Sequence, residues 1–354
     1  MPDWTASMQQ TFEYYIVDPG TWKDVRLLDT VKSCTITRES DSETRGSATF
    51  DITETIGECY IRTYLVTIQN GVRERFPLGT FLVQTPSYSF DGKVKAVSAD
   101  AYTPLLELKE KHPPIGYYVS EGVNIMSTVG RLSREHTRAP IVGVSCDEVL
   151  NGDFVAMSSD TWLTFIRDLM AQAKYSFDLD ELGRILFSRN KDMASLQPVW
   201  TYDDGNSSIL LPDFSLDRDL YGIPNVVEVI YSGYTSPYTA RVVNDDSNSP
   251  ISTVNRGREI VHRVTDPSFT GDLDPTKHQI DEYATQLLKE LSTLEYTLSY
   301  SHGYCPVRVG DCVRINYSRS GYTGLKAKVI SQSIKCDVGC QVTEKAICTT
   351  KFWR

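Results

Sequence analysis

Long apolar runs are missing from this sequence. No stretch of its 354 residues approaches the roughly 20 apolar residues that a transmembrane helix needs. The N-terminal segment MPDWTASMQQTFEYY has neither a basic region nor an apolar core, so it does not have the features of a signal peptide. We therefore expect no membrane anchoring, and a protein that is made and first used in a cytoplasm.

Basic charge is also scarce. The chain carries 36 Lys and Arg against 46 Asp and Glu, which gives a formal net charge of −10. A surface that grips nucleic acid needs a basic stripe, so the composition argues against sequence-specific DNA or RNA binding. An acidic wall would still let a phosphate backbone slide past it, although solubility alone is an equally good explanation of the charge.

Motifs for catalysis and cofactor binding are absent as well. The five histidines lie in no HExxH motif, and there is no G-x-S-x-G, P-loop or dinucleotide-binding fingerprint. Asp178, Asp180 and Glu181 lie close together, but on a predicted hairpin turn, where a solvated acidic tip is the ordinary explanation. The loop at Asp245 and Asp246 lacks the spacing of an EF-hand. We expect no catalytic residue, no cofactor and no enzyme activity.

The eight cysteines are concentrated near the C-terminus, with five in the last 50 residues. Because a reducing cytoplasm keeps thiols free, we expect no disulfides. Most of the cysteines stand in alternating apolar segments such as CVRI and AICTT, where Cys acts as a small buried hydrophobe. The spacings of Cys305 to Cys312 and of Cys336 to Cys340 are looser than those of zinc knuckles. We expect no metal, and these four are the residues to consider if one is present.

Short alternating strands and tight turns fill residues 1–105. The run Tyr60–Ile68 (YIRTYLVTI) is β-branched and aromatic, and Asn70-Gly71 follows it. Asn-Gly between two such runs is the strongest short hairpin signal, because both residues must adopt positive φ. A second hairpin is predicted at Asp91-Gly92. This spacing of strands is typical of a small barrel or sandwich.

Helical periodicity begins after residue 105. It predicts helices over Val123–His136 and Asp160–Lys174, the second capped by Ser159 or Asp160, and then a hairpin. Strand patterns return near Ser208, with one further helix over 275–291. We therefore predict a mainly β protein in which two tube-like β-barrel or sandwich domains of one shared fold, 1–105 and 199–354, flank an α+β insert, 106–198.

The stretch HGYCPVRVGDCVRI, residues 302–315, gathers a histidine, two cysteines and an aspartate. It follows a predicted strand, and a new strand starts at Cys312. Gly310 can supply an unusual backbone angle, and Asp311 a local hydrogen bond. We interpret Gly310-Asp311 as a tight turn between two strands, so that His302, Cys305 and Cys312 need no catalytic role.

The order of these pieces carries a family resemblance. Leu287–Leu291 ends a helix, a strand follows, and then comes Pro306-x3-Gly310-Asp311-x-Val313. In the first half, Pro77–Val83 is followed by a hairpin and by Val97–Tyr102, and Asn225–Ile230 looks like the start of a second such domain. The whole resembles the baseplate hub and tail-tip hub proteins of bacteriophages with contractile or long non-contractile tails.

The resemblance implies a structural virion protein. Two tube-like domains per chain, taken three times, would make a pseudo-sixfold ring that joins the sixfold tail tube to a threefold tip or spike. The implied partners are two further copies of the chain, the tail tube and distal tail proteins, a tip, spike or fibre protein, and the tape measure protein. DNA would pass through the lumen without sequence-specific binding. The implied location is the tail tip or baseplate of the virion, after assembly in the host cytoplasm.

Two other functions stay open. A glycan-binding tail protein would suit the 20 tyrosines and 5 tryptophans, although most aromatics fall in strand patterns that indicate a core. A cell-wall hydrolase would require turnover that depends on a carboxylate or histidine. Because the last predicted strand is followed closely by Phe352-Trp353-Arg354, we expect wall cleavage and receptor contact to belong to another protein.

Overall fold

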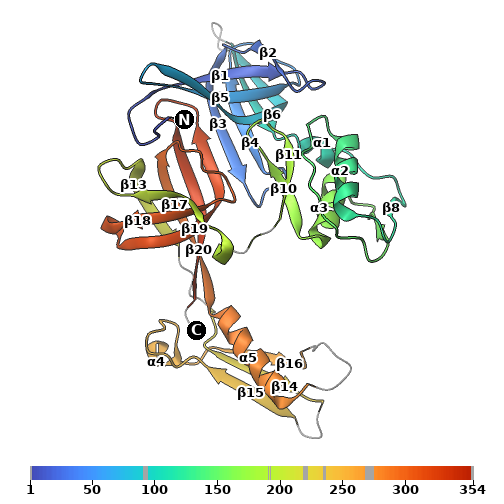
Figure 1. Ribbon diagram of the computed structural model, residues 1–354, viewed down its shortest axis with the longest axis vertical. Coiled ribbons are helices and arrows are strands. Elements are labelled where there is room, and N and C mark those ends of the chain that lie inside the picture. Colours follow the sequence, from blue (N-terminus) through green and yellow to red (C-terminus); the bar gives the residue numbers. More distant parts are fainter. Residues whose placement is uncertain are drawn as a thin grey trace. The chain divides into compact units, whose positions relative to one another are not determined.

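The computed structural model describes residues 2–90, 95–189, 191, 193–217, 222–233, 237–267 and 275–351. The chain forms two compact units, which we call the larger unit (Met1–Phe214 with Ser299–Ala346) and the smaller unit (Ser215–Leu298 with Ile347–Arg354). In the described residues, no helix is both long and apolar enough to cross a bilayer. The sheets dominate (Figure 1), so the prediction of a mainly β protein with a small α+β insert is confirmed.

The first β part lies in the larger unit. Its strands are β1 (Gln9–Val17), β2 (Asp24–Leu27), β3 (Val31–Glu39), β4 (Gly46–Ile52), β5 (Tyr60–Gln69), β6 (Val72–Phe90) and β7 (Lys95–Tyr102), hydrogen-bonded in the order β2-β1-β5-β6-β7-β4-β3. Asn70 and Gly71, with φ of 51° and 77°, form the two-residue turn between β5 and β6. The turn predicted at Asp91-Gly92 lies outside the described residues.

The insert is a separate layer of helices beside the first β part (Figure 1). It contains α1 (Leu106–Lys109), β8 (Tyr118–Val119), α2 (Ile125–His136), β9 (Phe154–Val155), α3 (Trp162–Gln172), β10 (Tyr175–Leu179) and β11 (Ile185–Arg189). The apolar stripe of α3, from Trp162 to Met170, is buried in its core. The cap of α3 is Thr161, not the predicted Ser159 or Asp160. Asp160 instead accepts the N–H of Met157, in the preceding turn.

The second β part repeats the topology of the first. Its strands are β12 (Pro198–Asp203), β13 (Leu210–Asp217), β17 (Thr293–Gly303), β18 (Cys312–Tyr317), β19 (Tyr322–Lys335) and β20 (Gln341–Lys351), in the order β12-β18-β19-β20-β17-β13. Taken in chain order, they match β1, β3, β4, β5, β6 and β7 one for one, in the order β1-β5-β6-β7-β4-β3. One orientation differs, because β1 is antiparallel to β5 whereas β12 is parallel to β18. At the level of strand order, the predicted duplication is present.

In the described part of the chain, an antiparallel ladder between β3 and β19 joins the two β parts; we call it the internal join. Ser331–Lys335 of β19 pairs with Thr35–Glu39 of β3, and Ile334 lies opposite Ile36. Just beyond the ladder, the N–H of Cys336 donates to the carbonyl of Cys34 at 2.9 Å. The join unites the strands of both parts in one 13-stranded sheet.

The smaller unit is built between two strands of the second β part, β13 and β17. It holds β14 (Val226–Tyr231), β15 (Tyr238–Val243), β16 (Val261–Thr265), the short α4 (Thr253–Arg256) and α5 (Lys277–Leu291), which covers one face of the sheet β15-β14-β16 (Figure 1). Ile280, Ala284 and Leu288 of α5 are fully buried against the sheet. The resemblance assigned Asn225–Ile230 to the start of the second tube-like domain. That was wrong, because these residues form the central strand of this separate sheet. The predicted boundaries at residues 105 and 198 remain a proposal.

The turn between β10 and β11, Asp180–Gly183, docks on both β parts; we call it the insert turn. The carbonyl of Leu182 accepts hydrogen bonds from the side chains of Trp22 (2.8 Å), Thr80 (3.0 Å) and Arg62 (3.1 Å). Glu181 forms an ion pair with Arg308 at 2.8 Å. The expectation of a solvated acidic tip was therefore wrong for Glu181, which is engaged by this docking, and for Asp180, which is paired with Arg184 within the same turn.

A glycine is required where the insert turn meets β6. Gly183 has φ +74°, and a Cβ there would lie 2.6 Å from the Cβ of Thr80. Gly183→Ala should therefore lower the unfolding free energy by about 2–4 kcal/mol, from backbone strain and overpacking together. Gly122→Ala is the matched control, because its φ is +81° and nothing lies within 4 Å. It should cost about 1 kcal/mol in chemical denaturation; equal losses in the two variants would show that the docking does not constrain this turn.

Candidate functional site

Six polar side chains meet in the interior of the second β part; we call them the buried polar cluster. They come from four strands and one loop: Tyr202 on β12, Tyr300 and His302 on β17, Cys305 after it, Gln332 on β19 and Glu344 on β20. His302 and Glu344 have no exposed surface, and Cys305 is 2% exposed. Two members, His302 and Cys305, belong to the stretch HGYCPVRVGDCVRI.

Glu344 is the centre of the cluster. Its Oε1 lies 2.6 Å from Gln332 Nε2 and 3.4 Å from His302 Nε2, and its Oε2 accepts from Tyr300 OH at 2.7 Å. The hydroxyl of Tyr202 lies 3.0 Å from His302 Nε2 and 3.2 Å from Cys305 Sγ. Each carboxylate oxygen therefore has a donor, which is the condition for keeping a charge inside a protein.

The contacts fix an ion pair in the cluster. Burial alone would lower the pKa of His302, but its contacts with Cys305 and Glu344 outweigh burial and raise the pKa to about 10. Burial would likewise raise the pKa of Glu344, but His302, Tyr300 and Gln332 hold it below its ordinary value. These shifts, with a backbone carbonyl facing His302 Nδ1 and Glu344 facing Nε2, favour an imidazolium at His302 and a carboxylate at Glu344. Burial, and then the charge of Glu344, raise the pKa values of Tyr202 and Tyr300, so both hydroxyls stay protonated.

The cluster has the residue types of a catalytic site, but its reactive groups are not accessible to a substrate. A substrate must reach the nucleophile or base within hydrogen-bond distance, and the histidine and carboxylate here have no exposed surface. The arrangement ties β12, β17, β19 and β20 together.

The sequence analysis missed Glu344, although the sequence contains a signal for it. Glu344 alternates with Val342, Ala346 and Cys348, which are all buried, so a charged residue stands in an inward-facing row of the strand.

Gly310 and Asp311 lie immediately before β18. Gly310 has φ +94°, and its N–H donates to the carbonyl of Val329 at 2.8 Å. The N–H of Asp311 donates to the carbonyl of Arg308, and the Asp311 carboxylate accepts the N–H of Arg308 at 2.9 Å. Burial raises the pKa of Asp311, although its contacts with Arg308 oppose the shift. Asp311 thus makes the local contacts that a turn requires, whereas Gly310 is hydrogen-bonded to Val329 of β19.

The cysteines lie in several places. None of the eight cysteines forms a disulfide, and six are buried, as the apolar pattern predicts. Cys305 belongs to the buried polar cluster, Cys312 begins β18, and Cys336 is hydrogen-bonded to Cys34 beside the internal join. Cys340 lies in the turn before β20. Among the described residues, no three His, Cys, Asp or Glu side chains are grouped as metal ligands.

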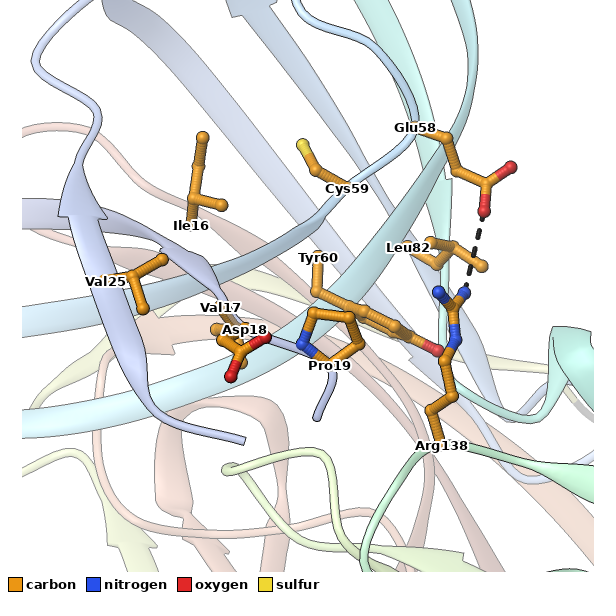
Figure 2. A pocket seen from close by; sticks show the side chains of 10 residues that line it. All are labelled: Ile16, Val17, Asp18, Pro19, Val25, Glu58, Cys59, Tyr60, Leu82 and Arg138. Atoms are coloured by element: carbon orange, nitrogen blue, oxygen red, sulfur yellow. Dashed lines mark ion pairs between the residues drawn. The ribbon is translucent and has the colours of Figure 1, made fainter. Parts of the chain in front are cut away.

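A pocket of about 360 Å³ opens on the first β part, where the end of β1 meets β2. Figure 2 shows Ile16 and Val25 on one side, with Arg138 and Glu58 facing each other on the other side. Arg138 is already paired, at 3.5 Å with Glu58 and at 2.5 Å with the buried Glu107. The guanidinium of Arg138 is thus neutralised within the chain, and the carboxylate of Asp18, which also lines the pocket, accepts hydrogen bonds from Gly20 and Thr21 of its own turn.

Solved structures of tail proteins share this fold. The crystal structure of a tail protein from Neisseria meningitidis MC58 matches with a TM-score of 0.61 and 11% identity, over 95% of this chain and 96% of that one. The 43 kDa tail protein of prophage MuSo2 from Shewanella oneidensis matches with a TM-score of 0.60 and 11% identity, over 96% and 98%.

A further solved structure, a protein complex, shares the fold. In the Francisella PdpA-VgrG complex, a chain matches with a TM-score of 0.55 and 9% identity, over 97% of this chain and 53% of that one. No protein-family profile and no curated protein sequence matches the chain. The resemblance to tail hub proteins is thus confirmed at the level of fold.

The ion pair in the cluster makes stability depend on pH. Because the pKa of His302 is raised from its ordinary 6.5, its protonated form stabilises the fold fully at pH values below 6.5. This stabilisation is lost as the pH rises towards 10. The lowered pKa of Glu344 stabilises the fold above its ordinary 4.5, and this is lost in acid. Between these limits, near pH 5.5, Glu344→Gln should cost about 3–5 kcal/mol, because it leaves a buried imidazolium unpaired.

Denaturation at pH 5.5, 7.5 and 9.5 measures this dependence. The unmodified chain should lose stability across the series, whereas Glu344→Gln should lose much less. Glu295→Gln, an exposed carboxylate on β17, is the control and should follow the unmodified chain. A Glu344→Gln protein that declines as steeply as the unmodified one would contradict the ion pair.

The backbone angle at Gly310 gives a second test. No atom lies within 4 Å of a Cβ placed there, so Gly310→Val should act through strain alone and cost about 1–3 kcal/mol. Gly57→Val is the control, because Gly57 also has open space around it but no positive φ. Thermal unfolding of both variants measures the difference. A loss at Gly57 as large as that at Gly310 would refute the role of the angle.

Proposed function

We propose that this chain is a structural subunit of a phage tail and that three copies form a baseplate hub ring. The observation that carries the proposal is the internal join between two β parts of one strand order. The ring would link the sixfold tail tube to a threefold tip or spike. We assign no enzyme activity to it.

The geometry of the internal join supports a ring. β3 is an end strand of its part, whereas β19 matches β6, an inner strand. The two parts therefore meet through different surfaces, in a head-to-tail manner. A head-to-tail contact that repeats builds either a closed ring or an open filament. Each chain contributes two β parts, so a ring of six β parts needs three chains. Such a ring has six similar β parts but threefold symmetry, which is the symmetry conversion that a hub performs.

The partners follow from this position in the tail. On one side we propose the tail tube and distal tail proteins, and on the other a tip, spike or fibre protein, with the tape measure protein and then DNA in the lumen. The net charge of −10 supports a lumen that does not hold phosphate. The virion tail is the proposed location, after assembly in the host cytoplasm.

The structure favours neither alternative function. Trp4 and Trp162 are buried, and Trp22 packs against the core of the insert, so these rings are not offered to a sugar. A hydrolase would need an accessible acid or base, and the histidine and carboxylate of the buried polar cluster have no exposed surface. Glycan arrays and peptidoglycan turnover remain direct checks of both.

Mass measurement and imaging of the purified protein test the ring. Light scattering should give three times the 39.9 kDa of one chain, and negative-stain images should show rings with a central hole. Mobility-shift assays with duplex DNA serve as the companion measurement and should show no sequence-dependent binding. Compact monomers at every concentration, or open filaments, would count against the hub.

A further inference from the structure

The insert contains a two-stranded ribbon, β8 and β9, which we call the insert ribbon. The strands pair antiparallel, with Tyr118 opposite Val155 and Val119 opposite Phe154. Because alternate residues share a face of a strand, these two pairs lie on opposite faces. Val119 and Phe154 pack into the core of the insert. Tyr118 and Val155 are 56% and 58% exposed, so nothing in the described chain covers the outer face of the ribbon.

The apolar exposure extends beyond the four paired residues. The N–H of Ala156 donates to the carbonyl of Tyr117, so the pairing continues towards Met157, which is 73% exposed. Towards the other end, Val149 is bridged to the N-cap residue of α2 and is 48% exposed. The insert ribbon and its extensions thus expose four large apolar side chains: Tyr118, Val149, Val155 and Met157.

The segments that form the insert ribbon are acidic. Residues 113–130 and 139–166 contain no Lys, Arg or His. They hold four exposed carboxylates, those of Glu121, Asp147, Glu148 and Asp153. In the part of the chain that the structure describes, none of the four takes part in an ion pair. The chain therefore leaves negative charge beside an apolar face without supplying a counter-charge.

We propose that the outer face of the insert ribbon binds a basic amphipathic helix of a partner protein. The apolar side of the helix would cover the four exposed apolar side chains, as α5 covers one face of the sheet in the smaller unit. Its Lys and Arg side chains would pair with the four carboxylates. A helix suits this face because side chains that point out of a sheet are covered by a layer on top, which strand addition at an edge does not supply. The proposal does not depend on the ring.

Charge selects the class of partner. Nucleic acid and anionic lipid are both negative, so carboxylates beside the apolar face repel them. A protein segment that is apolar on one side and basic on the other is attracted by the same carboxylates, and this attraction also speeds association. An exposed apolar face bordered by polar groups is typical of an interaction site.

Two matched peptides test the proposal. The probes are a labelled helical peptide of about 18 residues, or five turns, with Leu on one side and Lys on the other, and the same peptide with Glu in place of Lys. Fluorescence anisotropy should show micromolar binding of the Lys peptide to the full chain, and binding of the Glu peptide that is weaker by about tenfold or more. Added salt should weaken the Lys peptide's binding, because it screens exposed charges.

Substitutions locate the binding site. V149S/V155S should weaken binding of the Lys peptide by about tenfold, because two apolar contacts are lost. D147N/E148Q should weaken it by about threefold or more, because two charges are lost. The matched controls, V254S/V338S and D245N/E295Q, remove exposed valines and exposed carboxylates elsewhere and should leave binding unchanged. Circular dichroism and thermal unfolding establish that every variant is folded.

Several outcomes would overturn the proposal. They are a Lys peptide that does not bind, one that binds all variants alike, and a Glu peptide that binds equally well. Two more would assign the face to another occupant. Binding of anionic phospholipid vesicles that V149S/V155S abolishes would assign it to a membrane, and self-association that the same variant abolishes would assign it to a second copy of the chain.

Discussion

The internal join is the constraint on which the larger unit depends. A five-residue antiparallel ladder between β3 and β19 makes one sheet from two β parts that each have their own strand order. Backbone pairing alone would be a modest tie, because a net hydrogen bond contributes about 0.5–1.5 kcal/mol. Buried polar groups around the ladder reinforce it, because leaving any of them without a hydrogen-bond partner would lower the free energy of unfolding.

Arg38 on β3 connects these polar groups. The guanidinium of Arg38 donates one hydrogen bond to the carbonyl of Leu78 and another to the side chain of Gln332. Gln332 in turn donates to Glu344. The buried polar cluster is thus linked through one side chain to the strand on the other side of the join. The insert turn adds a second link, since Glu181 pairs with Arg308 of the second β part while Leu182 accepts from the first. The insert thereby fastens the two β parts to each other.

The sequence predicts what local chemistry determines. Asn70-Gly71 forms its turn because both residues tolerate positive φ. The apolar residues of α3 are buried because their helical spacing places them on one face of the helix. The strand Asn225–Ile230 was misplaced because an apolar strand looks the same in either sheet. The insert turn was misread because its partners, Trp22, Arg62 and Thr80, are about 100 or more positions away. Acidic turn residues next to a glycine carry no local sign of such contacts.

The pairing of Ile36 with Ile334 has a consequence for how the chain is made. The strand that completes the edge of the first β part, β19, is synthesised only after the insert, the smaller unit and most of the second β part. Contacts this distant in sequence form slowly, and open strand edges meanwhile attract other chains. Until β19 is available, the segment Thr35–Glu39 of β3 has no strand on that side, and its charged residues are Arg38 and Glu39. Charged residues on a temporary edge hold off premature pairing, so the timing of translation, and not only the final energy, shapes what this edge can contain.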